Sequence, residues 1–118
     1  MRAVALYQGA FLARHVDFPW AIALRERLRV KFMRHLAERG RGLFQAGSHD
    51  AAVALFEKGL AADPLAEEFY RQLMVCYQAM DLRAEAIGVY RRCEKTLAAA
   101  LGLAPAEKTV ALYRTLLN

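Results

Sequence analysis

The sequence predicts an all-helical protein, built as a stack of antiparallel helix pairs with about six helices. Three observations lead to this fold class: a pattern that repeats after 34 residues, apolar side chains spaced three and four residues apart, and no segment with sustained period-two alternation. With 118 residues, 57% hydrophobic and 25% charged, the chain has the size and composition of one globular domain. We therefore expect residues 1–118 to form a single domain.

The repeat lies in the middle of the chain, where apolar or small residues return at an offset of 34. This period is typical of helix–turn–helix repeats of the tetratricopeptide type, whose stacked pairs bury a continuous core. The helix-pair repeats are expected at about residues 36–63 and 70–97. Eight positions define the packing: Leu36 and Tyr70, Leu43 and Tyr77, Ala52 and Ala86, Phe56 and Tyr90. For the three tyrosines the pattern favours a core role over the lining of a peptide-binding groove.

A short helix, a connector and a long helix are expected at the start of the chain. The short helix should cover residues 3–12, and Pro19-Trp20 should open the long one, at about residues 20–46. The apolar stripe expected to face a core in the long helix is Leu24, Leu28, Phe32, Leu36 and Leu43. Gly40 and Gly42 weaken this helix and are candidates for a bend. Trp20, the sole tryptophan, is expected to anchor the N-terminal segment, whereas an exposed Trp20 would indicate an interface.

Turn signals separate four further helices. Gly47-Ser48 ends the long helix, and Ser48 is a candidate N-cap for a helix at residues 50–62. Asp63-Pro64 and Asp81-Leu82 should flank a helix at residues 67–79, and Gly102 should end a helix at residues 83–101. A last helix at residues 106–117 would cap the stack with Val110, Leu112, Tyr113 and Leu116. Small residues, Gly40, Ala52 and Gly59 among them, are expected where helices approach closely.

The net charge of +5 is concentrated in one segment. Residues 25–41 hold seven basic side chains against two acidic ones, so the rest of the chain is neutral. The candidate basic interaction face of the long helix consists of Arg27, Lys31, Arg34 and Arg41, which share one side of the helix. A solvated helix face is the simplest interpretation of these four cations. The functional interpretations are contact with phosphates of a nucleic acid and contact with an acidic protein partner. Arg25, Arg29 and Arg39 lie nearer the apolar stripe, where we expect buried stems and heads paired with carboxylates.

Catalysis, cofactors and metals find no support in the sequence. The three histidines are scattered, no Cys/His set has metal-ligand spacing, and there is neither a glycine-rich phosphate loop nor a serine elbow. Cys76 and Cys93 are expected to be reduced core thiols. Charges interrupt every apolar run well before the ~18 residues of a membrane-spanning helix, and no secretory signal is present. We expect a cytoplasmic protein that is not an enzyme and has no membrane partner.

The chain resembles the bacterial transcriptional activator domain, a tetratricopeptide-like module of transcription regulators. The similarity covers nearly the full length and is carried by residues 6–12, 19–20, 25–29, 62–68, 101–105 and 111–114. It implies a regulatory module whose partners are other domains of the parent regulator, partner proteins or a second copy in a homodimer. The resemblance also implies that the parent contacts DNA through a separate domain. Met1 lies almost inside the first predicted helix with no polar cap before it, which favours a fragment of a longer regulator.

The function we expect is therefore a non-catalytic protein–protein interaction and regulatory domain of a bacterial transcriptional regulator. Two alternatives stay open at this point. One is direct nucleic-acid binding through Arg27, Lys31, Arg34 and Arg41, and the other is a stand-alone tetratricopeptide adaptor.

Overall fold

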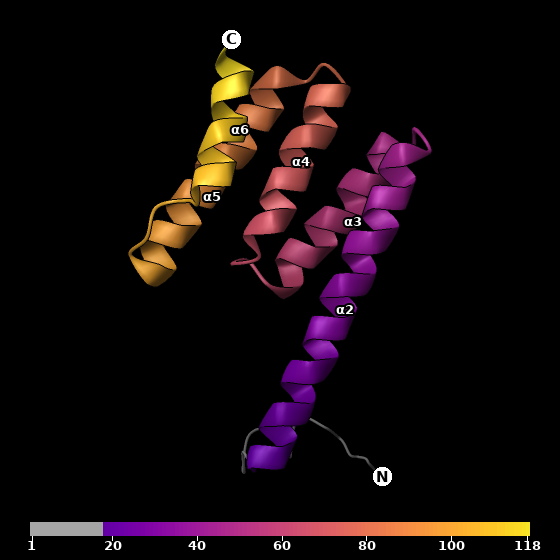
Figure 1. The fold of residues 1–118 in the computed structure, drawn as a ribbon, viewed down its shortest axis with the longest axis vertical. Coiled ribbons are helices and arrows are strands. Elements are labelled where there is room, and N and C mark those ends of the chain that lie inside the picture. Colours follow the sequence, from indigo (N-terminus) through magenta and orange to yellow (C-terminus); the bar gives the residue numbers. More distant parts are fainter. Residues whose placement is uncertain (1–17) are drawn as a thin grey trace. The chain divides into compact units, whose positions relative to one another are not determined.

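The computed structural model describes residues 18–118, and all regular structure within them is helical. The helices are α2 (Pro19–Gln45), α3 (His49–Ala62), α4 (Glu67–Ala79), α5 (Arg83–Leu101) and α6 (Glu107–Leu117), joined by short turns into antiparallel neighbours (Figure 1). Five of the about six predicted helices are thus seen, and the one expected at residues 3–12 lies outside the described part. The all-helical, tetratricopeptide-like fold class is confirmed.

Contacts divide the chain into an N-terminal unit, Met1–Met33, and a C-terminal unit, Arg34–Asn118. The helix α2 continues through Gly40 and Gly42 as one element, so neither glycine interrupts it. In the N-terminal unit the described residues are those of α2 up to Met33, together with Phe18.

The bounds of α3 to α6 agree with the predicted ones to within one residue, because each lies beside a local turn signal. After α2, the Ser48 N–H donates to the Leu43 carbonyl at 2.8 Å, a bond that closes the helix end. Ser48 does occupy the N-cap position of α3, but its side chain makes no capping bond. Its carbonyl accepts from the Ala52 N–H at 3.0 Å, so the prediction that Ser48 is the N-cap is confirmed, and the bond is made by its backbone.

The turn between α4 and α5 contains Asp81 with a positive φ of 61°. The Leu82 N–H donates to the Tyr77 carbonyl at 2.8 Å and closes the end of α4. Aspartate tolerates this left-handed backbone better than most residues with a side chain. The Asp81-Leu82 turn expected from the sequence is therefore present, with Asp81 in the place that glycine usually takes.

The core of the C-terminal unit lies between α3, α4 and α5, with α6 packed against α4 and α5. Phe56 of α3 and Phe69 of α4 meet edge to face, with ring centroids 5.7 Å apart. Tyr90 of α5 stacks on Tyr113 of α6 at 4.0 Å. The side chains with no exposed surface come from three helices and from α6: Ala52, Phe56, Leu73, Met74, Cys76, Ala86, Cys93 and Thr109.

Two glycines allow the helices of this core to approach closely. A Cβ added at Gly40 would lie 2.4 Å from the Phe56 ring, and one at Gly59 would lie 2.1 Å from the Phe69 ring. Such distances are too short for any methyl group, so the two rings occupy the space that a side chain would need. The expectation of close approach at Gly40 and Gly59 is confirmed, and the role of Gly40 is packing rather than bending.

Candidate interaction surface

The first half of α2 carries a surface that the sequence did not predict to be exposed. Leu24 has 42% of its surface exposed, Leu28 56% and Phe32 41%. These three residues were predicted to face a core, and that prediction was wrong for this half of the helix. Farther along the same apolar stripe, Leu36 is buried and Leu43 is half-buried in the C-terminal unit. Periodicity identified the stripe correctly but not how far along the helix it is covered.

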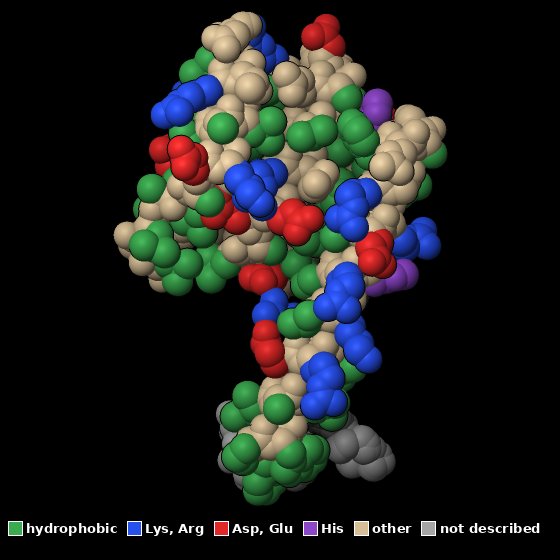
Figure 2. Space-filling model, viewed as in Figure 1, with side chains coloured by type: hydrophobic (Ala, Val, Ile, Leu, Met, Phe, Trp, Pro, Cys, Tyr) green, Lys and Arg blue, Asp and Glu red, His purple; other side chains and the backbone are tan. Residues whose placement is uncertain are grey.

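Trp20 is the most exposed large apolar side chain of the described residues, at 63%. Its ring stacks nearly parallel to that of Phe18, with centroids 6.1 Å apart. Hydrophobic side chains gather over the first turns of α2 in Figure 2. An exposed tryptophan beside other exposed apolar side chains is the pattern of an interface rather than of an anchor.

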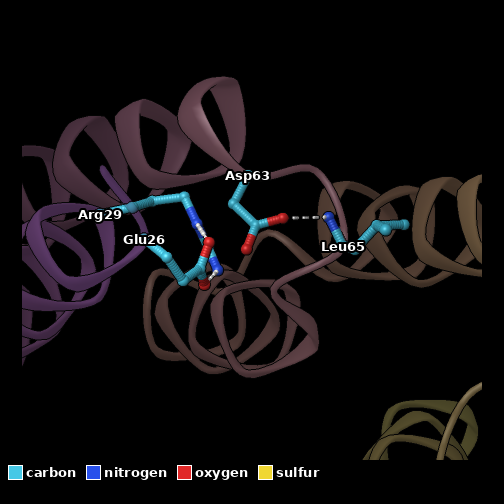
Figure 3. Close-up of polar contacts among 4 residues, drawn as sticks. All are labelled: Glu26, Arg29, Asp63 and Leu65. Atoms are coloured by element: carbon cyan, nitrogen blue, oxygen red, sulfur yellow. Dashed lines mark hydrogen bonds and ion pairs between the residues drawn. The ribbon is translucent and has the colours of Figure 1, made fainter. Parts of the chain in front are cut away.

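An open groove of about 570 Å³ lies along the same helix segment and shares Leu28 and Phe32 with the exposed apolar stripe. It is lined by Ile22, Leu28 and Phe32 together with the charged side chains Arg25, Glu26 and Arg29. Glu26 and Arg29 face each other in Figure 3, and the Arg29 Nε donates to Glu26 Oε1 at 3.3 Å. The hydrogen bond from Arg29 lowers the pKa of the Glu26 carboxyl. Arg25, Arg29 and Arg39 are all exposed, and the Arg29 head pairs with the Glu26 carboxylate as expected.

All four residues of the predicted basic face are exposed on α2. Arg27 and Lys31 belong to the N-terminal unit, and Arg34 and Arg41 to the C-terminal unit. Arg41 is engaged with Glu68 of α4, with the two groups 3.4 Å apart. For Arg27, Lys31 and Arg34, no ion pair is found within residues 18–118. An interaction role for the four cations stays a prediction.

The charged residues of the C-terminal unit hold its helices together. Arg92 of α5 forms two hydrogen bonds of 2.9 Å to Glu57 of α3 and lies over the Tyr70 ring, 5.7 Å from its centroid. This bidentate pairing raises the pKa of the Arg92 guanidinium. Glu67 of α4 accepts from the Ala106 N–H at 2.7 Å and from the Thr109 hydroxyl. These groups serve the packing of the unit.

The sequence did not predict the role of Thr109. This residue is fully buried and accepts from the Arg71 guanidinium at 3.0 Å while donating to Glu67. It fixes the N-terminus of α6 to α4. A threonine three residues after Ala106 is a weak signal of such a role. Thr109 lies 38 positions after Arg71 and 42 positions after Glu67, so only the tertiary structure could show that these residues pair.

The eight repeat-defining positions all lie in the C-terminal unit. Six of them are buried (Leu36, Ala52, Phe56, Tyr70, Ala86 and Tyr90), and two are half-buried (Leu43 and Tyr77). The Tyr70 hydroxyl donates to the Pro64 carbonyl at 2.8 Å, which satisfies its polar end. Burial raises the pKa values of Tyr77 and Tyr90. No one of these tyrosines is widely open to solvent, and their positions favour packing over ligand contact.

A second open groove, of about 640 Å³, lies beside the turn between α3 and α4. It is mostly apolar, and its lining residues are Pro64, Leu65, Lys95, Thr96, Ala99 and Ala100. Asp63 shapes this turn, since its carboxylate accepts from the Leu65 N–H at 3.1 Å (Figure 3). This groove could not be predicted from the sequence, because its two sides are 30 residues apart in the chain.

Cys76 and Cys93 are both buried free thiols. Burial raises the pKa of both, to about 11 for Cys93, which leaves them protonated and unreactive at neutral pH. Within residues 18–118, no three His, Cys, Asp or Glu side chains are grouped so that they could hold a metal ion.

Comparison with known proteins assigns the family. The model of the bacterial transcriptional activator domain matches residues 1–117. The chain belongs to this family. It is 32% identical over 120 residues to the transcriptional regulatory protein EmbR of Mycobacterium tuberculosis, a match that covers 98% of the chain and 30% of EmbR. It is also 35% identical over 72 residues to the transcriptional regulatory protein MoaR1 of the same organism, covering 61% of the chain and 23% of MoaR1.

A solved structure shows the same fold. The structure of M. tuberculosis EmbR in complex with a low-affinity phosphopeptide superimposes with a TM-score of 0.69 at 32% sequence identity, over 84% of this chain and 25% of that one. The chain thus spans less than a third of the length of the regulators it matches. Every helix within residues 18–118 is too short or too polar to cross a bilayer.

Proposed function

We propose that this chain is a non-catalytic regulatory domain of a cytoplasmic bacterial transcriptional regulator and that it acts by protein–protein contact. The observation that carries the proposal is the exposed apolar surface at the start of α2, where Trp20, Leu24 and Leu28 all face solvent. The family supports the regulatory role, and the phosphopeptide bound to EmbR supports, in general terms, a protein partner. The contacts would be with other domains of the parent regulator, with partner proteins or with a second copy of the chain.

The proposal is tested in the regulator that contains this chain. Transcription from its target promoter is compared for the intact regulator, for a deletion of residues 1–118 and for the double variant Leu24→Gln/Leu28→Gln. We expect the deletion and the double variant to impair regulation alike. The variant Leu101→Gln is the matched control, since Leu101 is 51% exposed on α5 and lies outside this surface. Normal regulation by both the deletion and the double variant would contradict the proposal.

Nucleic-acid binding is the second candidate function. It is favoured by one observation: Arg27, Lys31 and Arg34 are exposed cations that form no ion pair within the described residues. Affinity for phosphates falls steeply with salt. Fluorescence anisotropy of a labelled DNA duplex, titrated with the chain at about 50 mM and about 200 mM salt, decides this candidate. If no complex forms at the lower salt concentration, the candidate is excluded.

A further inference from the structure

One line of apolar side chains in the N-terminal unit has the spacing of a helix-docking surface. Trp20, Leu24 and Leu28 follow each other every four residues along α2, with 63%, 42% and 56% of their surfaces exposed. Residues at this spacing lie above one another on a helix. We refer to Trp20, Leu24 and Leu28 as the Trp20 stripe.

Two cations border the Trp20 stripe. Arg27 lies three residues after Leu24, and Lys31 lies three residues after Leu28, which places both beside the stripe on the helix surface. Both are exposed, and neither is ion-paired within residues 18–118. The only carboxylate of residues 18–33 is Glu26, and it is bound by Arg29. The surface is therefore apolar along its centre and positive along its edge.

We propose that the Trp20 stripe is the docking site for an acidic amphipathic α-helix of a second protein. The apolar side of that helix would cover Trp20, Leu24 and Leu28, and its Asp or Glu side chains would pair with Arg27 and Lys31. Amphipathic helices dock in this way through anchors three and four residues apart, and charges beside the seam select the partner. The inference rests on the proposed function, because it identifies the partner chemistry for the same surface.

The size of the stripe favours a single helix over a second copy of this chain. The three anchors span about two turns of α2, the length over which one amphipathic helix can lay its apolar side along another. A second copy would also bring the same cations to the contact without free carboxylates, since Glu26 is already engaged. The cations at the edge would raise the association rate of a separate acidic protein, because such charges mainly accelerate diffusional encounter.

Trp20 supplies the readout, since it is the only tryptophan of the chain. The full 118-residue chain is titrated with a synthetic helical peptide that has leucines on one side, glutamates along its edges and no tryptophan. A second peptide carries lysines in place of the glutamates. We expect the acidic peptide to shift the Trp20 emission to shorter wavelength, and its affinity to fall as salt is raised. The lysine peptide should bind at least about tenfold more weakly, as two lost edge ion pairs and added repulsion predict.

Variants separate the apolar and the charged contributions. Leu28→Gln keeps the helix propensity but removes an apolar anchor. It should weaken the binding of the acidic peptide roughly tenfold or more. The double variant Arg27→Glu/Lys31→Glu should no longer bind the acidic peptide and should bind the lysine peptide instead. Its matched control is Lys58→Glu/Arg91→Glu, a reversal of two exposed cations in the C-terminal unit, which should leave the peptide preference unchanged. Circular dichroism checks that every variant keeps its helix content.

Several outcomes would overturn the inference. Trp20 could prove inaccessible to acrylamide quenching in the chain alone, or both peptides could bind equally well. Alternatively, sedimentation could show dimers that Leu28→Gln dissociates, or a DNA duplex could bind through Arg27 and Lys31 without any effect of Leu28→Gln. Failure of the peptide experiment leaves the proposed function standing if Leu24→Gln/Leu28→Gln still impairs regulation by the intact regulator. Normal regulation by that variant and by the deletion of residues 1–118 would contradict both the inference and the proposed function.

Discussion

Residues 18–33, which comprise Phe18 and the first part of α2, contain large apolar side chains like those of the C-terminal unit. The two regions differ in how far these side chains are exposed. Seven large apolar residues of the short segment are at least 41% exposed: Phe18, Trp20, Ile22, Leu24, Leu28, Val30 and Phe32. Over the whole C-terminal unit only four large apolar residues are exposed, at 38% or more of their surface: Leu65, Leu101, Leu103 and Leu117. A helical apolar stripe is thus a core in one region and an open surface in the other. The difference lies in what packs against it, and not in the composition of the helix.

The charges of the two regions differ in the same sense. In the C-terminal unit two ion pairs join different helices, Arg92 with Glu57 and Arg41 with Glu68, and a third, Arg71 with Glu67, lies within α4. In residues 18–33 the ion pair between Arg29 and Glu26 stays within one turn of α2. Pairs within one helix add little to tertiary stability, whereas pairs between helices fix their register. The pairs between helices therefore contribute to the packing of the C-terminal unit.

The largest expected difference comes from truncating one phenylalanine in each region. Phe56→Ala should reduce the free energy of unfolding by about 3–5 kcal/mol, because its fully buried ring fills the space beside Gly40. Phe32→Ala, at 41% exposure, should cost far less. Urea unfolding followed by circular dichroism measures both. Equal losses for the two variants would show that the contrast between the regions is wrong.

A methyl group tests how tightly the C-terminal unit is packed. Gly59→Ala should destabilise it by about 1–3 kcal/mol, since the new Cβ would lie 2.1 Å from the Phe69 ring. Gly88→Ala is the matched control, because nothing lies within 4 Å of its Cβ position on α5. That change should stabilise the helix by up to about 1 kcal/mol. Thermal unfolding of both variants gives the comparison, and the same sign for both would refute the packing argument.

The attachment of α6 depends on one carboxylate. Glu67→Gln should cost about 1–2 kcal/mol, because the Thr109 hydroxyl and the Ala106 N–H would lose a charged acceptor in a part-buried site. Glu68→Gln removes only an exposed pair with Arg41 and should cost less than about 0.5 kcal/mol. Hydrogen exchange of α6 amides and urea unfolding report the effect. Unchanged protection of α6 in Glu67→Gln would count against the role assigned to this network.

The smallest effect is expected at the most exposed aromatic residue. Trp20→Ala should change the free energy of unfolding by less than about 0.5 kcal/mol, since its ring is 63% exposed. Circular dichroism is the suitable measurement because the variant has no tryptophan fluorescence. A loss of stability comparable with that of Phe56→Ala would mean that Trp20 belongs to a core. It would contradict the interaction surface assigned to α2.

Much of the fold could be predicted from local signals. The bounds of the helices after α2 follow from Asp63-Pro64, Asp81-Leu82 and Gly102, which act on their immediate neighbours. The close approaches at Gly40 and Gly59 follow from the 34-residue repeat, because stacked pairs need small residues at fixed positions. The N-cap position of Ser48 was also predicted correctly, although its backbone carbonyl, and not its side chain, accepts the hydrogen bond from α3.

The candidate surface could be predicted only in part. The basic residues Arg27 and Lys31 were identified from their spacing, but the exposure of Leu24 and Leu28 was not. Amphipathic periodicity shows that one side of a helix is apolar, and it does not show where along the helix a neighbour covers that side. For the same reason the burial of Thr109 was missed, because it depends on Glu67 and Arg71 from another helix.

By itself, the sequence determined the helical class, the turns and the family, because these depend on residues close together in the chain or on a pattern that recurs at a constant interval. Only the tertiary structure decided which apolar residues are core and which charges are engaged within the C-terminal unit. Burial and ion pairing depend on segments that are distant in sequence, such as Glu57 and Arg92. Trp20, Leu24 and Leu28 are exposed within residues 18–118, and their spacing alone does not specify whether another segment covers them.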